Sequence, residues 1–274
     1  MKELVAFCGA LLLVQCLGHV VGDSQEEEWE KFKANYGKVY IGTEDDKRHQ
    51  IWKTNLAYIN RHNKEADKGR HSYRLGVNTY ADMTRKERDI LLRNGELSEA
   101  ADYCKGKPDY RHGKLPESMD WRSFGFVTPV KSQGMCGSPW AFAAIGAIES
   151  RNAIYCSPHQ LVSLSEQNLV DCSGKYGNYG CNGGLMDSSY GYIMDNGGVD
   201  TGASYPYEGK DDKCRFNPNT IGADIRGCVD LPKGNETALQ IILFTGGPVA
   251  VGIHSAVPSF EFYKSGKLYK VKGQ

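Results

Sequence analysis

Residues 129–142 read PVKSQGMCGSPWAF, and this stretch predicts a buried helix that begins at Pro139. Proline is favoured at the first position of a helix, and Ser138 directly before it is a good N-cap residue. Residues 141–148 then read AFAAIGAI, which is apolar on every side of a helix. A helix of this kind belongs in the core of a domain.

The composition of the whole chain is that of an ordinary globular protein. Its 274 residues carry 33 basic and 33 acidic side chains, so the formal charge is zero and a phosphate backbone is not a favoured partner. With 40% apolar and 24% charged residues, the chain is long enough for one large or two modest domains. Nucleic-acid binding and general disorder are therefore excluded.

The first 22 residues differ from the rest, because Lys2 precedes an apolar run over residues 4–17 that ends near Gly18 and Gly22. This pattern predicts a secretory signal peptide over residues 1–22. The run is short of the roughly 20 residues that a spanning helix needs. We expect a protein of the secretory pathway, extracellular or lysosomal, with no membrane attachment after cleavage. Asn235, in the sequon N-E-T, is a glycosylation candidate.

Residues 26–94 are charge-dense and free of proline, and their apolar residues recur with helical spacing. Trp29, Phe32 and Tyr36 predict one amphipathic helix, and a second begins after Thr43. Seven residues of this second helix share one face: Glu44, Arg48, Ile51, Trp52, Asn55, Ile59 and Asn63. A short strand over residues 74–80 and a helix starting at Asp82 follow.

Those seven residues form the pattern E-x3-R-x2-I-W-x2-N-x3-I-x3-N, which resembles the helix motif of cathepsin L-like propeptides. Residues 76–82, GVNTYAD, are similar to the second propeptide motif, G-x-N-x-F-x-D, through Gly76, Asn78, Tyr80 and Asp82. The resemblance implies a helical propeptide domain of the inhibitory type over residues 23–94. Family propeptides occlude their own cleft, so we expect this one in the cleft of the same chain.

Residues 95–114 shift to Gly, Lys, Pro and Asp and predict an exposed linker. From residue 116 to 263 the chain resembles papain-family peptidases, beginning with PESMDWR at residues 116–122. The implied fold is α+β: a papain-like two-lobe domain over residues 115–274, with a helical left lobe and an incomplete β-barrel-like right lobe. The family continues through several more strands, so we expect a truncated lobe with unpaired strand edges.

The resemblance also assigns the catalytic positions. The family signature is C-G-S-C-W, in which the first Cys forms a disulfide and the second is the nucleophile at a helix N-terminus. Here Cys136 takes the first position and Pro139 the second. Proline offers no nucleophile, and it lacks the backbone N–H that completes the oxyanion hole with the side chain of Gln133.

The partners of the nucleophile are also missing from the expected places. The last histidine, His254, ends an alternating strand over residues 248–254, and the last asparagine is Asn235. We therefore expect neither the general base nor its orienting Asn, and without a base Ser138 does not replace the thiol. No cofactor and no metal are implied.

Nine cysteines are present, of which Cys8 and Cys16 leave with the signal peptide, so at least one of the remaining seven is unpaired. The resemblance implies the disulfides Cys136–Cys181 and Cys172–Cys214. Cys104, Cys156 and Cys228 remain, and a Cys156–Cys228 bridge is one possibility.

Substrate-binding residues are implied at five positions: Gly137, Gly183, Gly184, Leu185 and Met186. The two adjacent glycines would let a peptide backbone approach, and Leu185 and Met186 would form an apolar pocket. A simple tight turn explains the two glycines equally well.

The leading hypothesis for function is a cathepsin L-like peptidase homologue that is inactive as written and acts by binding peptide segments. One alternative is an inhibitor that presents residues 24–112 to active cathepsin L-like peptidases. Another is a truncated product of a cysteine-type peptidase precursor, without a stable fold. A live peptidase is the least favoured reading, because the nucleophile, one oxyanion donor, the base and the orienter are all missing.

Overall fold

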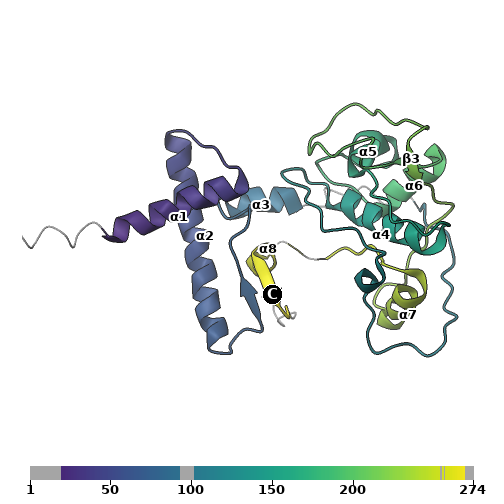
Figure 1. Ribbon diagram of the computed structural model, residues 1–274, viewed down its shortest axis with the longest axis horizontal. Coiled ribbons are helices and arrows are strands. Elements are labelled where there is room, and N and C mark those ends of the chain that lie inside the picture. The colour runs from purple at the N-terminus through teal and green to yellow at the C-terminus, as the bar shows by residue number, and fades with distance from the viewer. Residues whose placement is uncertain (1–19, 93–101, 254, 256, 269–274) are drawn as a thin grey trace, which may run out of the picture. The chain divides into compact units, whose positions relative to one another are not determined.

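The computed structural model describes residues 20–92, 102–253, 255 and 257–268 (Figure 1). The chain divides into two compact units. The N-terminal unit consists of residues up to 88 together with those from 256 on, and the central unit of residues 89–255. Residues 1–19 of the predicted signal peptide lie outside the described residues, and its last three residues begin the first helix. No described helix is long and apolar enough to cross a bilayer.

The N-terminal unit combines helices with a small two-stranded sheet. Its elements are α1 (Val20–Tyr36), α2 (Thr43–Asp67), β1 (Tyr73–Leu75), the start of α3 (Arg85–Leu92), α8 (Pro258–Glu261) and β4 (Tyr263–Gly266). In Figure 1, α1 crosses α2, and β4 lies beside β1. The two strands are antiparallel, with Tyr73 opposite Gly266. The last described segment of the chain is therefore built into the same unit as α1 and α2.

An aromatic core holds this unit together. Trp29 and Phe32 of α1 pack against Trp52 of α2, with Trp29 completely buried. The predicted pair of helices is confirmed. Tyr36, the third residue of the predicted stripe, instead lies at the rim, 38% exposed, where its hydroxyl donates to the carbonyl of Val77. One end of the stripe therefore serves a hydrogen bond rather than the core.

The polar residues of the α2 face hold the irregular segment before α3. The amide of Asn55 donates to the carbonyls of Ala81 and Met83 at 2.8 and 3.0 Å. Asn63 both donates to and accepts from the backbone of Leu75, at 2.9 and 3.0 Å. Because a buried backbone group without a partner is costly, these amides allow a chain without regular structure to pack against the helix.

Charged residues lie at the N-terminal end of this α2 face. Arg48 bridges Glu44 and Glu87 at 2.7 and 2.8 Å. Asp82 is completely buried and accepts hydrogen bonds from Tyr40 at 2.6 Å and from Lys38 at 3.3 Å. A lone buried carboxylate would be strongly unfavourable, so these two donors explain how the motif tolerates an acid here.

Two expected boundaries in this unit are wrong. The strand over residues 74–80 is only three residues long, Tyr73–Leu75. The helix expected to start at Asp82 starts at Arg85 instead, because Thr84 and Glu87 form a reciprocal capping box. Asp82 lies before the helix and binds Tyr40.

The remaining motif residues fix the C-terminal segment. The side-chain amide of Asn78 donates to the carbonyl of Glu261 at 2.7 Å. The backbone N–H of Gly76 donates to the carbonyl of Phe262 at 2.8 Å. A Cβ on Gly76 would lie 2.8 Å from the Lys264 side chain, so this close approach favours glycine. Tyr80 is half-buried, and burial raises the pKa of its hydroxyl.

The central unit is arranged around α4 (Pro139–Tyr155), which packs against α5 (Glu166–Cys172) and α6 (Met186–Asn196). Its core includes Trp140, Ile145, Leu169 and Ile193, all essentially buried. Two short helices, Trp121–Phe124 and Ser173–Tyr176, the helix α7 (Glu236–Gly246), and the antiparallel pair β2 (Val199–Asp200) and β3 (Ile221–Ala223) complete it. The predicted buried helix at Pro139 is confirmed.

The strand expected over residues 248–254 is not formed. Residues 247–253 have neither helix nor strand, and Val251 and Ile253 are more than half exposed. A strand needs a hydrogen-bonding partner, and no described segment of the central unit pairs with these residues. Alternating apolar residues alone therefore did not define a strand.

Candidate functional site

The N-terminus of α4 begins the site. Pro139 occupies the first helical position, and the carbonyl of Ser138 accepts the first helical hydrogen bond, from the N–H of Ala141 at 3.0 Å. The expected capping by the Ser138 side chain is wrong, because its hydroxyl bonds the hydroxyl of Tyr207 at 2.8 Å instead. Tyr207 also donates to the carbonyl of Gln133 at 2.9 Å. This tyrosine, which the sequence did not single out, ties the two sides of the site together.

The side chain of Gln133 lies beside this helix start. Its amide donates to the carbonyl of Cys136 at 2.8 Å and to the carbonyl of Leu91, in the last turn of α3, at 3.4 Å. The Leu91 carbonyl also lies 3.6 Å from the position that a Cβ on Gly137 would take. The end of α3 therefore places a peptide carbonyl against the amide that the resemblance assigns to the oxyanion hole.

Gly137 is required for close packing of two segments. Its N–H donates to the carbonyl of Cys181 at 3.0 Å, and a Cβ on it would lie 2.5 Å from that oxygen. Gly137 also forms a parallel bridge with Asn182. The structure thus brings Gly137 beside Cys181 and Asn182.

The two adjacent glycines, Gly183 and Gly184, lie in a tight turn. Gly183 has φ +117°, and its carbonyl accepts from Tyr179 at 2.8 Å. A Cβ on Gly184 would lie 2.7 Å from the Trp140 ring. Both glycines are buried, so the tight-turn reading describes them directly.

The two residues expected to line an apolar pocket, Leu185 and Met186, differ in their packing. Met186 packs against the core of the central unit, and Leu185 is half-buried at the N-cap position of α6. The N–H of Leu185 donates to the side chain of Asn178 at 2.8 Å. Because Met186 packs against the core, Leu185 is the residue of the two that remains available to contact a bound peptide.

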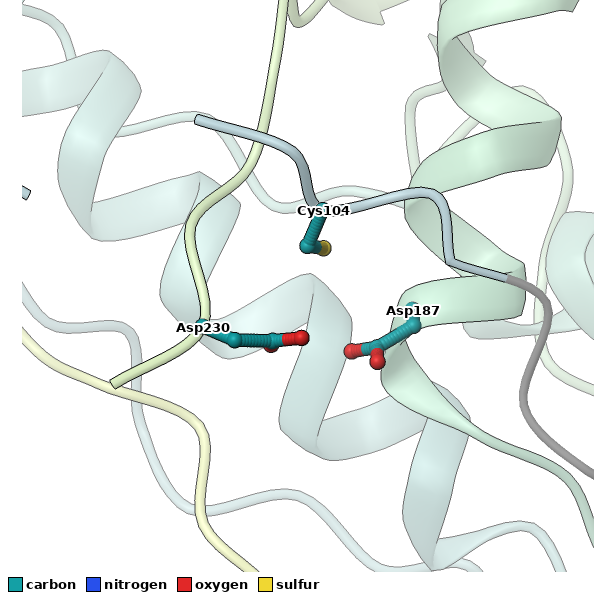
Figure 2. A group of neighbouring side chains, drawn as sticks. All are labelled: Cys104, Asp187 and Asp230. Carbon is teal, nitrogen blue, oxygen red and sulfur yellow. The ribbon is translucent and has the colours of Figure 1, made fainter. Parts of the chain in front are cut away.

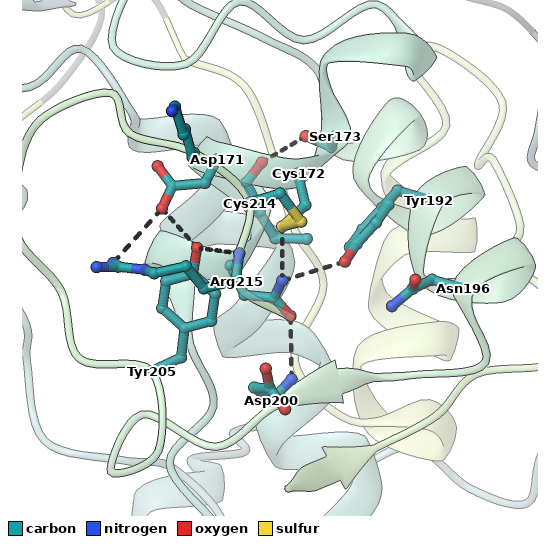
Figure 3. Close-up of a disulfide and its surroundings, with 12 residues drawn as sticks. Asp171, Cys172, Ser173, Tyr192, Asn196, Asp200, Tyr205, Cys214 and Arg215 are labelled. Carbon is teal, nitrogen blue, oxygen red and sulfur yellow. Dashed lines mark hydrogen bonds and ion pairs between the residues drawn. A yellow bond between two sulfur atoms is a disulfide. The ribbon is translucent and has the colours of Figure 1, made fainter. Parts of the chain in front are cut away.

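The structure forms both disulfides that the resemblance implies, Cys136–Cys181 and Cys172–Cys214. Figure 3 shows the second disulfide between Cys172 and Cys214. Asn168 donates to the Cys172 sulfur and to the Tyr192 hydroxyl. Asp171 accepts from Tyr205 at 2.6 Å on the other side. The Cys156–Cys228 bridge is wrong: Cys156 is a free, exposed thiol, and Cys228 pairs with Cys104.

A buried ion cluster holds the segment before α4, through Lys131, against that helix. Lys131 contacts both Glu149 and Glu166 at 2.6 Å, and Glu149 also accepts from the backbone of Leu164. Burial lowers the pKa of Lys131, but the bonds to the two carboxylates outweigh it and the pKa is raised. Burial raises the pKa of Glu166. The pairing of residues so far apart in sequence explains why the sequence did not single out Lys131.

No described histidine of the central unit hydrogen-bonds to the start of α4. The ring of His159 lies against the carbonyls of Ala153 and Ile154, at the opposite end of the helix from Pro139. With a rise of 1.5 Å per residue, the two helix ends are about 24 Å apart. His112 is exposed and bonds the carbonyl of Gly113. His254 lies outside the described residues.

One group of possible metal ligands occurs among the described residues: Cys104, Asp187 and Asp230, with ligand atoms within 4.8 Å of one another (Figure 2). The sulfur of Cys104 is bonded to Cys228, so it is not a thiolate ligand. Two carboxylates remain, and Asp230 is exposed. We assign no metal to this group.

Comparison with known families decides the identity of the fold. Residues 115–274, more than half of the chain, match the model of the papain family cysteine proteases. The chain belongs to the papain family. Residues 29–87 match the cathepsin propeptide inhibitor domain. The chain is thus a cathepsin L-like papain-family peptidase precursor. The propeptide match covers all of α2 and β1 and parts of α1 and α3.

Individual relatives agree with this membership of the papain family. A cathepsin L-like peptidase of Aedes aegypti is 46% identical over 254 residues, covering 89% of this chain and 74% of the relative. Mouse procathepsin L is 41% identical, over 95% of this chain and 78% of the relative. The solved digestive procathepsin L2 proteinase of Tenebrio molitor matches with a TM-score of 0.81 at 37% identity, over 91% of this chain and 81% of that chain.

Proposed function

We propose that this chain is a papain-family homologue that does not hydrolyse peptides and acts by binding them. The observation that carries the proposal is Pro139 at the first position of α4, where the family signature has its nucleophile. A proline in a peptide bond has no thiol and no N–H. One residue therefore removes both the group that attacks the substrate and one donor that stabilises the resulting oxyanion.

The scaffold around Pro139 supports a retained binding role. The helix begins normally, because Pro fits its first position, and Trp140 directly after it is buried. Gln133 keeps an amide donor, which here meets the Leu91 carbonyl. A peptide carbonyl is thus the kind of group that the Gln133 amide binds, and α3 of the same chain supplies one.

A thiol-directed peptidyl epoxide tests whether a nucleophile exists at the site. We expect no adduct on the tryptic peptide of residues 132–151, because Cys136 is in a disulfide and Pro139 has no reactive atom. Slow labelling of the exposed Cys156 is expected, with mass spectrometry of the reduced, digested chain as the readout.

The matched control is Cys156→Ser, which should remove that adduct and leave the rest of the map unchanged. Iodoacetamide, which has no peptide portion, should label Cys156 equally well. A rapid, stoichiometric adduct within residues 132–151 would contradict the proposal.

A second candidate function is inhibition of active relatives by the propeptide. It is favoured by the complete aromatic core and the Arg48 bridge of the N-terminal unit, and by the match to an inhibitor domain. One feature limits it: β1 already pairs with β4 of the same chain. A partner that needs β1 must first displace that strand.

Inhibition of an active cathepsin L-like peptidase by the full chain tests this candidate. We expect nanomolar inhibition, weakened at least about a hundredfold in Trp29→Ala, because losing a fully buried Trp costs about 3 to 5 kcal/mol of the fold. Phe124→Ala, an exposed aromatic change in the central unit, should leave the inhibition unaltered. No inhibition at micromolar concentration of the chain would rule out this function.

A further inference from the structure

The linker between the two family matches is covalently attached to the peptidase domain. Cys104 lies after the propeptide match and before residue 115, and it forms a disulfide with Cys228, 124 residues later. Both residues belong to the central unit. The expectation that residues 95–114 form an exposed linker is therefore wrong at Cys104, which is buried; residues 93–101 lie outside the described part of the chain.

Contacts on both sides of Cys104 dock this segment. The N–H of Gly106 donates to the carbonyl of Cys228 at 3.0 Å, and Lys105 forms an antiparallel bridge with Val229. A Cβ on Gly106 would lie 2.6 Å from the Val229 side chain, so glycine permits the approach. The disulfide therefore sits in a short strand-like pairing rather than at the end of a loose loop.

Tyr103 anchors the other side. Its ring packs against Tyr176, with centroids 5.9 Å apart. It also occupies the space beside Gly191 of α6, where a Cβ would lie 2.6 Å from the ring. A larger residue at position 191 would displace this ring, so the surface of α6 is shaped to receive it.

The segment that follows is open to proteases. Residues 109–114 are exposed and have neither helix nor strand. The ion pair of Arg111 is with Asp109, two residues away and equally on the surface, so it does not fasten the segment to the domain. Exposed segments without regular structure are preferred sites of proteolytic nicking.

We propose that cleavage of residues 109–114 yields a two-chain protein in which the Cys104–Cys228 disulfide keeps the propeptide attached to the peptidase domain. Hydrolysis consumes one water and breaks one peptide bond, and the disulfide is untouched. Release then requires a dithiol, which supplies two electrons and two protons, leaving thiols at Cys104 and Cys228 and a disulfide in the reductant. This inference goes beyond the proposed function and holds whether or not Pro139 abolishes catalysis.

The surroundings of the tether slow its reduction. Figure 2 shows the carboxylates of Asp187 and Asp230 facing each other near Cys104, and the ligand atoms of the three residues lie within 4.8 Å of one another. Burial, followed by the charge of Asp230, raises the pKa of Asp187. Negative groups beside a disulfide repel an attacking thiolate and disfavour the thiolate that leaves. Asp230→Asn should therefore speed reduction several-fold, and Asp230 is exposed enough for the change to be tolerated.

The tether also favours binding of the propeptide to its own domain over binding to another peptidase. A segment joined to its own domain has a high effective concentration there, of millimolar order for a short connection. Propeptide held in this way competes with substrate at its own domain. Another peptidase must compete with that domain for the propeptide, so reduction of the tether after cleavage should strengthen inhibition of other molecules.

The test uses the full chain with a viral-protease recognition sequence inserted after Gly113. After cleavage and blocking of free thiols with N-ethylmaleimide, a denaturing gel should show one species without reductant and two fragments with dithiothreitol. Cys104→Ser/Cys228→Ser should give two fragments under both conditions, and Cys156→Ser should behave like the parent. Two fragments from the parent without reductant would overturn the proposal.

Peptide mapping of the wild-type chain without reduction keeps the proposal testable if the cysteine variants fail to fold. Trypsin should release residues 94–105 crosslinked to residues 227–233, each containing one cysteine. A crosslink from either peptide to the one that contains Cys156 would contradict the assignment.

Discussion

Glu261→Ala is expected to lower the free energy of unfolding of the N-terminal unit by about 3 to 5 kcal/mol. The side chains of Glu261 and Arg88 form an ion pair at 2.6 Å and are 0% and 5% exposed. Removing the carboxylate leaves the guanidinium buried over the Phe262 ring, with the Met83 carbonyl as a remaining acceptor. The cost arises mainly from this uncompensated charge rather than from the lost attraction.

The chain supplies a control in an exposed ion pair of the same length. Asp109 and Arg111 form an ion pair at the same distance, 2.6 Å, but their side chains are 57% and 91% exposed. Asp109→Ala should cause no measurable change, because water screens and replaces the interaction. Glu261→Gln should fall between the two, since it keeps the shape and one hydrogen bond but not the charge.

Hydrogen exchange at the Gly76 amide reports this effect within the full chain. That N–H donates to the carbonyl of Phe262, the residue after Glu261, so its protection follows the docking of the segment. Protection should fall by about two to four powers of ten in Glu261→Ala, in line with its free-energy cost. Equal protection in Glu261→Ala and Asp109→Ala would contradict this account of the buried pair.

The local features of the fold could be predicted from the sequence. Helical spacing located α1 and α2, and Pro139 marked the first residue of α4. The two Asn residues on the α2 face, unusual for an apolar stripe, are explained only by the backbone of residues 75–83 that they contact. Their partners lie 12 to 28 residues away, beyond what helical spacing encodes.

The site was harder to predict where it depends on distant partners. Cys104 and Cys228 are 124 residues apart, and cysteine spacing alone leaves several pairings open. Lys131 and Tyr207 are unremarkable in the sequence, and only the fold brings them to Glu149 and Gln133. Residues 248–253 show the converse error, because alternating apolar residues describe a strand only when another strand pairs with them.

The second large effect that we expect is the absence of peptide hydrolysis. In a serine peptidase whose catalytic residues were removed individually, loss of the nucleophile lowered turnover by about a millionfold. Pro139 also removes one N–H donor of the oxyanion hole, while Gln133 remains. We therefore expect turnover about a millionfold below that of a relative with an intact site.

The two roles of Pro139 are separated by Pro139→Ala, which restores the backbone N–H without supplying a nucleophile. Its hydrolysis should also stay at background, because an oxyanion donor has nothing to stabilise until a nucleophile attacks. Cys156→Ser serves as the control for the one free thiol among the described residues.

The most direct measurement is hydrolysis of a fluorogenic peptide substrate by the purified chain, after the segment of residues 109–114 has been cut and the tether reduced. The expected rate is that of buffer alone for the wild-type chain, Pro139→Ala and Cys156→Ser. Hydrolysis that follows the wild-type chain through purification, persists in Cys156→Ser and scales with its concentration would contradict a binding protein without peptidase activity.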